Sequence, residues 1–179
     1  MSAPAAFATA GAAPARLLVV DDDGGLIGIV SQNDLFALQR TGLNNVTSSI
    51  REAKDMPSLQ ACSRDIRSMA NTLLGQGVSA EQLTHLISTL NDLLTLRIIE
   101  LTHDEFELPQ VKWCWVALGS EGRYEQTLST DQDNGIIFEA DGADVEDVRG
   151  SLLPFADAVN RKLDACGFPL CKGGIMAGN

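Results

Sequence analysis

The chain has 179 residues, 45% of them hydrophobic and 21% charged, which is ordinary for a soluble globular protein with one or two domains. Its formal net charge is −11, so it lacks the basic surface of a nucleic-acid-binding protein, although a nucleotide bound with magnesium stays compatible with this charge. No apolar run reaches the ~18 to 20 residues of a membrane span, and four scattered cysteines with only two histidines favour a reduced cytoplasmic protein without zinc.

Residues 1–15 are rich in alanine and lack a basic region before an apolar stretch. We therefore expect a disordered lead and not a signal peptide. Two short apolar runs follow, at 16–20 and 26–30, and the Asp/Gly-rich turn between them predicts a β-hairpin. Ser31 then has the character of a helix N-cap, with Asp34 three residues later, so helix capping is one interpretation of these two side chains.

The same segment also resembles a known motif. Residues 17–20, the Asp/Gly turn and Gly28-Ile29-Val30-Ser31-Gln32-Asn33-Asp34-Leu35 resemble the closing half of a CBS motif. The resemblance implies that Gly28, Ser31 and Asp34 contact the ribose and phosphate of an adenine nucleotide. We interpret residues 16–41 as a partial CBS motif, because the helix and strand that open the motif are not recognisable before residue 16.

A helical hairpin region, ending in a linker, is expected over residues 42–110. After a polar stretch, apolar residues recur at three- and four-residue spacing over 59–73 and again over 83–101. The capping box Ser79-x-x-Gln82 predicts the start of the second helix. A broad apolar face of this kind is typical of a packed core or of a dimer interface, and a cofactor-binding face is the remaining alternative.

Residues 111–179 contain the residues suited to chemistry. An apolar run at 113–118 leads into the turn Gly119-Ser120, and the pair Asp131-x-Asp133 precedes a second apolar run at 134–138. The backbone N–H groups and hydroxyl of a Gly-Ser turn suit a phosphate. Side chains two apart on a strand share a face, so the two carboxylates can bind one Mg²⁺. The pattern predicts a magnesium–nucleotide site; a capped turn on a solvated loop is the alternative for the aspartates.

The residues from Leu118 to Phe138, with Gly-Ser-Glu-Gly-Arg-Tyr-Glu-Gln-Thr and Thr-Asp-Gln-Asp-Asn-Gly, resemble the nucleotidyltransferase domain of bacterial CBS/cyclic-nucleotide-binding signalling proteins. That domain is similar to the nucleotidyltransferase part of protein-PII uridylyltransferases, in the superfamily of DNA polymerase beta. The resemblance covers roughly residues 42–179. It implies an α+β fold: a helical hairpin (42–110) followed by a polymerase-beta-like α/β core (111–179) that is truncated at its C-terminus, with the partial CBS hairpin in front.

By this resemblance Asp131 and Asp133 are catalytic magnesium ligands, and Gly119 and Ser120 hold the phosphates. Arg123 suits a phosphate because a guanidinium binds in a bidentate manner, and an ion pair with Glu121 or Glu125 is its alternative role. The implied reaction uses Mg²⁺ and transfers a nucleoside monophosphate from a nucleoside triphosphate to a hydroxyl, for example on a regulatory protein.

The superfamily usually supplies a third carboxylate from a later strand, and none is recognisable after Gly150. Complete Gly-Ser and Asp-x-Asp motifs favour an enzyme, whereas the missing carboxylate favours a non-catalytic nucleotide-sensing or dimerisation module. The expected partners are a nucleoside triphosphate and an acceptor protein, with no nucleic acid and no membrane. A homodimer through the CBS segment or the helical hairpin is a further option.

Overall fold

A computed structural model describes residues 5–8, 16–128, 130–140, 142 and 144–179, and gives only the backbone for 5–8, 16 and 32–41. The chain divides into two compact units, Met1–Asn45 and Val46–Asn179, and each is described by itself. Helices and small antiparallel sheets make an α+β fold, as the sequence predicts. Within the described residues, every helix is too short or too polar to serve as a membrane span.

The first unit contains a three-stranded antiparallel sheet in the order β1 (Ala5–Ala8), β2 (Arg16–Val20) and β3 (Leu26–Ser31). The predicted hairpin is the β2–β3 pair. Its turn is stabilised by the Asp21 carboxylate, which accepts the backbone N–H groups of Asp23 at 3.1 Å and Gly25 at 2.6 Å. Strand β1 lies within the segment 1–15, so the prediction of a disordered lead is wrong for these four residues; pairing with β2 satisfies their backbone.

Helix α1 (Gln32–Glu52) starts directly after β3 and continues through the segment 42–52, which the sequence indicates only as a polar stretch. Its mean hydropathy is low, and only Ile50 among its described side chains is fully buried. Leu43, Val46 and Ile50 recur at three- and four-residue spacing, but they are few and stand among polar residues, so the composition of this half of the helix hides its period.

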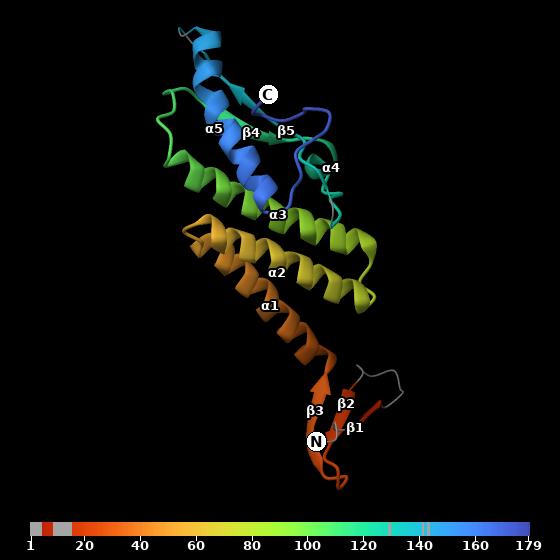
Figure 1. Cartoon of the computed structure of the whole chain (residues 1–179). Coiled ribbons are helices and arrows are strands. Elements are labelled where there is room, and N and C mark those ends of the chain that lie inside the picture. The colour runs from red at the N-terminus through yellow and green to blue at the C-terminus, as the bar shows by residue number, and fades with distance from the viewer. Residues whose placement is uncertain (1–4, 9–15, 129, 141, 143) are drawn as a thin grey trace. The chain divides into compact units, whose positions relative to one another are not determined.

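The second unit is built around α3 (Ala80–His103), which packs against α2 (Met56–Gly75) on one side and α5 (Val145–Ala165) on the other (Figure 1). The first two are the predicted helical hairpin. Ser79 caps α3 by accepting the backbone N–H of Gln82 at 3.4 Å, as the capping box predicts. Apolar side chains are buried on all three helices: Leu59, Cys62, Ile66, Ala70, Leu83, Ile87, Leu90, Leu94, Ile98, Val148, Leu152, Phe155, Val159 and Leu163. Among them Ala70, Leu83 and Ile87 form a cluster with the partly buried Leu73 and Leu128. The apolar stripe of the hairpin is therefore a packed core.

A two-stranded antiparallel sheet, β4 (Trp113–Ala117) with β5 (Asn134–Phe138), completes this unit. Trp113 is paired with Phe138 at one end, and Ala117 with Asn134 at the other. The Trp113 ring meets Phe155 of α5 edge-on at a centroid distance of 5.4 Å, which holds the sheet against the helices. The register places the residues that follow β4 beside those that precede β5, and these are the Gly-Ser turn and the Asp-x-Asp pair.

Candidate functional site

The Gly-Ser turn forms where β4 ends and the short helix α4 (Gly119–Gly122) begins. Gly119 has φ +55°, a conformation that side chains other than glycine rarely adopt. A Cβ at Gly119 would lie 3.2 Å from Cγ of Asp133 and in collision with its Oδ2. The Leu118 N–H also donates to the Asp133 carbonyl oxygen at 2.8 Å. The structure therefore brings the turn and one of the two predicted metal ligands into contact, and only glycine allows this approach.

Ser120 lies in the same turn, half-buried, and its carbonyl accepts the Glu125 N–H at 2.9 Å. Its hydroxyl makes no hydrogen bond to any residue that the structure describes. A hydroxyl without an internal partner at this position can donate to a ligand oxygen.

The Asp131-Gln132-Asp133 segment precedes β5, which begins at Asn134. The expectation that both aspartates lie on a strand is therefore wrong, since ladder pairing with β4 begins only at Ala117 and Asn134. Burial nevertheless alternates along the segment: Asp131 is exposed, Gln132 buried, Asp133 half-buried and Asn134 buried. In an extended chain this alternation directs both carboxylates away from the core.

A network of buried side-chain amides holds the acidic segment in place. The Gln132 amide donates to the carbonyl oxygens of Asn160 at 3.0 Å and Phe168 at 2.7 Å. Asn160, on α5, donates in turn to Gln132 Oε1 at 2.8 Å and to Asn134 Oδ1 at 2.9 Å. All three amides are buried and paired, so they specify one arrangement of the loop. The signal for this network in the sequence is Asn160, which stands among apolar residues that recur at helical spacing over 148–163.

Arg123 projects from the turn into solvent. Its Nε donates to Glu125 Oε2 at 2.8 Å, and both side chains are about 60% exposed. The structure thus shows the ion pair that the sequence left open as the alternative. An exposed pair of this kind contributes at most about 1 kcal/mol to stability, so exchange of Glu125 for a ligand phosphate costs little.

Gln126, which follows Glu125 in the chain, anchors the loop to α3. It is fully buried, its Oε1 accepts from Asn91 Nδ2 at 3.0 Å, and its N–H donates to Ser88 Oγ at 3.3 Å. Asn91 and Ser88 are buried polar residues in an otherwise apolar helix. Helix α3 is therefore part of the framework of the site and not only of the core.

Two further carboxylates lie near the turn, on Glu121 and on Asp92 of α3. Burial, followed by the negative charges of Asp92 and Asp133, raises the pKa of Glu121 to about 7. Burial also raises the pKa of Asp92, and the hydroxyl of Tyr124 partly offsets this. These two carboxylates lie on α3 and in the turn, whereas a third acidic group was expected on a later strand. No local pattern in the sequence distinguishes Asp92 from a solvent-facing helical residue.

The carboxylates of Asp131 and Asp133 can supply part of the ligand set of a Mg²⁺ ion. Mg²⁺ is usually bound through one or two carboxylates and completed by substrate phosphates and water, and Asp131 with Asp133 can supply the carboxylates. The described residues contain no group of three or more His, Cys, Asp or Glu side chains arranged to hold a metal ion. A metal at the aspartates would thus depend on a bound nucleotide for its remaining ligands.

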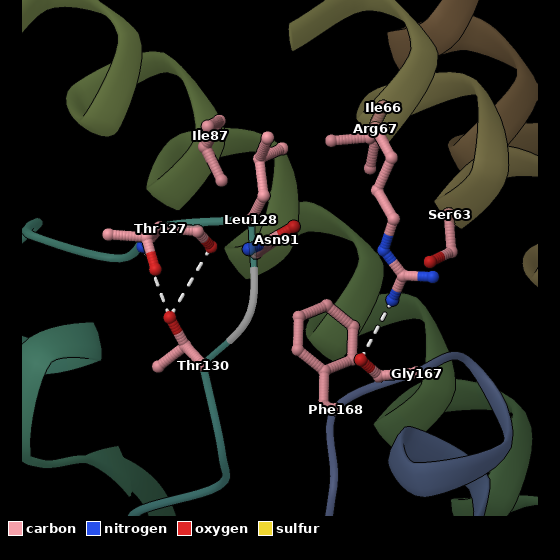
Figure 2. Close-up of a pocket in the computed structure, with 10 residues that line it drawn as sticks. All are labelled: Ser63, Ile66, Arg67, Ile87, Asn91, Thr127, Leu128, Thr130, Gly167 and Phe168. Carbon is pink, nitrogen blue, oxygen red and sulfur yellow. Dashed lines mark hydrogen bonds between the residues drawn. The ribbon is translucent and has the colours of Figure 1, made fainter. Parts of the chain in front are cut away.

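A small cavity beside this loop is a structural feature and not a ligand site (Figure 2). Its volume is ≈ 10 Å³, about the space of one water molecule. On one side Thr130 Oγ1 accepts the Thr127 N–H at 3.1 Å, and on the other the Arg67 guanidinium donates to the Gly167 carbonyl at 2.7 Å. The first bond lies within the loop, and the second links α2 to the turn after α5.

The residues expected to contact an adenine nucleotide lie in the first unit. Gly28 is within β3, and Ser31 ends that strand immediately before α1. The side chain of Asp34 lies outside the described residues. Nothing in the structure tests their role, which stays a prediction.

Residues 64–179, more than half of the chain, match a family model described as "Putative nucleotidyltransferase DUF294". The matched region contains α3, the Gly119 turn, both aspartates and the amide network. No match was found among curated proteins or among solved structures.

Proposed function

The chain belongs to this nucleotidyltransferase family, and from that premise we propose that it transfers a nucleoside monophosphate from a nucleoside triphosphate to a hydroxyl acceptor. We propose further that the reaction depends on Mg²⁺ and serves bacterial signal transduction, with a regulatory protein as acceptor, in the manner of a protein-PII uridylyltransferase. Family membership supports the general activity; the finer parts of the proposal follow from the motif resemblance.

The observation that carries the proposal is the contact between Gly119 and Asp133. It places a phosphate-binding type of turn against a carboxylate that can bind a metal, although the two are fourteen positions apart in sequence. A metal-bound triphosphate needs both kinds of group at one place. A solvated loop with a capped turn would not require a glycine at φ +55° packed on an aspartate side chain.

In this reaction the acceptor hydroxyl oxygen bonds to the α-phosphorus and loses its proton to solvent, the bond from that phosphorus to the bridging oxygen breaks, and pyrophosphate leaves with the electron pair. The backbone of Gly119 and the Ser120 hydroxyl bind the phosphates, and Arg123 turns from Glu125 toward them. Asp131 and Asp133 would hold Mg²⁺, which would supply positive charge to the phosphates. The amide network fixes Gln132, the residue between the two aspartates, and so supports their orientation.

A second candidate function is nucleotide sensing without turnover, in a regulatory or dimerisation module. The observation in its favour is that the described residues contain no metal-binding group of three acidic, histidine or cysteine side chains. Sensing could use the Gly119 turn, or Gly28, Ser31 and Asp34 of the hairpin that resembles a partial CBS motif.

The test is a titration of the four common nucleoside triphosphates with Mg²⁺ into the full chain and into Asp131→Ala and Asp133→Ala. We expect at least one triphosphate to bind, and each substitution to weaken that binding tenfold or more. Asp164→Ala, an exposed aspartate on α5, is the matched control and should bind as the unmodified chain does. Unchanged affinity in both site variants would show that the metal-site assignment is wrong.

Turnover is followed separately, as pyrophosphate release in the presence of candidate acceptor proteins. Release that is lost in Asp133→Ala supports the enzyme. Tight binding of the triphosphate without release, for every acceptor tried, supports the sensing function.

A further inference from the structure

Tyr124, which follows Arg123 in the loop after α4, has a backbone conformation that is unusual for its residue type. Its φ is +58°, and among the residues that the structure describes it is the one residue other than glycine with a positive φ. A bulky side chain in this region costs free energy, whereas glycine would make the same turn at no steric cost. Backbone strain of this kind persists where neighbouring contacts fix it, and it is concentrated at ligand-binding and active sites.

Backbone hydrogen bonds fix Tyr124 beside the proposed phosphate turn. Its N–H donates to the Glu121 carbonyl oxygen at 3.0 Å, and the N–H of Glu125 donates to the Ser120 carbonyl oxygen at 2.9 Å. Two successive residues of the loop are thus tied to the two residues that follow Gly119. The side chain of Tyr124 therefore starts at the edge of the turn that would hold the phosphates.

The ring of Tyr124 lies against helix α3. The centroids of the Tyr124 and His85 rings are 5.4 Å apart, and the two ring planes are inclined by 37°. Burial raises the pKa of Asp92, and a hydrogen bond from the Tyr124 hydroxyl partly offsets this rise. His85 and Asp92 are seven residues apart, about two helical turns, so they lie on the same face of α3. These contacts hold the ring in one orientation, yet Tyr124 remains 47% exposed.

Packing alone does not account for a tyrosine at this position. His85 is itself exposed, so its contact with the ring buries little apolar surface. A glycine at position 124 would relieve the backbone strain and leave the buried side chains of α3 unchanged. The distinctive property of Tyr124 is therefore an exposed aromatic surface, held in a fixed orientation next to the phosphate turn.

We propose that the exposed ring of Tyr124 stacks on the nucleobase of the triphosphate whose phosphates lie at Gly119 and Ser120. One ribose joins the base of a nucleotide to its α-phosphate, so a surface that binds the base must lie close to the phosphate turn, as Tyr124 does. Every base has a π-face, so this contact selects a nucleotide over a bare polyphosphate and does not distinguish the four bases. The inference rests on the proposed function and adds the part of the site that binds the base.

The test compares the magnesium complexes of ATP, GTP, CTP and UTP with that of inorganic tripolyphosphate, which has no base, by calorimetric titration of the full chain. Tyr124→Leu removes the ring and should weaken nucleotide binding about fivefold or more, with tripolyphosphate binding unchanged. Tyr124→Phe keeps the ring and should bind nucleotides as the unmodified chain does. Tyr124→Gly removes the ring and also fits the backbone at φ +58°, so it should match Tyr124→Leu without a loss of folding.

Tyr124 is the one tyrosine of the chain, so its ring can be observed directly by NMR. In a sample with ring-labelled tyrosine, a stacked base should move the ring proton signals upfield, whereas tripolyphosphate should leave them in place. A tyrosine that only packs against His85 would not distinguish the two ligands. His103→Leu removes another exposed ring, at the opposite end of α3, and should leave both affinities unchanged.

Three outcomes separate this inference from the proposed function. Equal nucleotide affinity of the unmodified chain, Tyr124→Leu and Tyr124→Gly, with tripolyphosphate still bound, would overturn the stacking and leave the proposed function intact. Nucleotide binding that moves the tyrosine signals but does not respond to Asp131→Ala or Asp133→Ala would support the stacking and reject the metal site of the proposed function. If none of the four nucleotides binds, both are wrong.

Discussion

Replacement of Glu121 by glutamine should stabilise the protein at neutral and alkaline pH. The substitution keeps the shape of the side chain and removes a charge that is partly withdrawn from water and faces Asp92 of α3 and Asp133 of the segment before β5. Its pKa is raised from 4.5 to about 7 in the folded chain. One pKa unit corresponds to about 1.4 kcal/mol, so the ionised carboxylate costs up to about 3 kcal/mol of folding free energy at pH 8.

The sign of the pH dependence follows from whether the folded or the unfolded chain binds the Glu121 proton more tightly. The folded chain binds it more tightly, because the pKa of Glu121 is raised on folding. The stabilising contribution of the protonated Glu121 is therefore complete below pH 4.5 and is lost as the pH rises through 7. The difference in unfolding free energy between Glu121→Gln and the unmodified chain should therefore be near its minimum at pH 4.5 and grow until about pH 7.5.

Urea denaturation of both proteins at pH 5, 6, 7 and 8 measures this difference. Glu125→Gln, at an exposed position in the same loop, is the control and should show no such growth. If Glu121→Gln gains no stability between pH 5 and pH 8, Glu121 is not desolvated beside like charges, and the assignment of an acidic region around the turn is wrong.

Three other substitutions test the framework of the site. Gly119→Ala adds a Cβ at φ +55° that collides with the Asp133 carboxylate, so thermal denaturation should show a loss of at least about 1 kcal/mol, and triphosphate binding should weaken. Asn160→Ala removes the hydrogen bonds that Asn160 donates to the buried amide oxygens of Gln132 and Asn134 and the one it accepts from the Gly178 N–H, so urea denaturation should show a loss of about 3 kcal/mol. Asp144→Ala removes the N-cap of α5 and should cost about 1 kcal/mol with triphosphate affinity unchanged, whereas a change in affinity would connect this remote cap to the site.

Local sequence determined the helices and strands whose apolar residues recur at a regular spacing or whose ends carry a characteristic turn or capping residue. The hairpin β2–β3 and helices α2, α3 and α5 follow from alternation, capping residues and apolar spacing, because these depend on neighbours within a few positions. The motif from Gly119 to Asp133 was also recognisable, because glycine, serine and paired aspartates have distinct chemistry. In helix α1 beyond Thr41 the apolar period is short, with Leu43, Val46 and Ile50 among polar residues, and β1 pairs with a distant strand, β2.

Contacts between distant segments required the tertiary structure. Sequence could name Gly119 and Asp133 but not show that one packs on the other, nor that Asp92 from α3 influences Glu121. Desolvation and the charge of neighbours depend on how helices and strands pack, and no local window contains that information. The sequence by itself identified the chemistry of the turn and its aspartates, and the packing of α3 and α5 decided which polar side chains surround them.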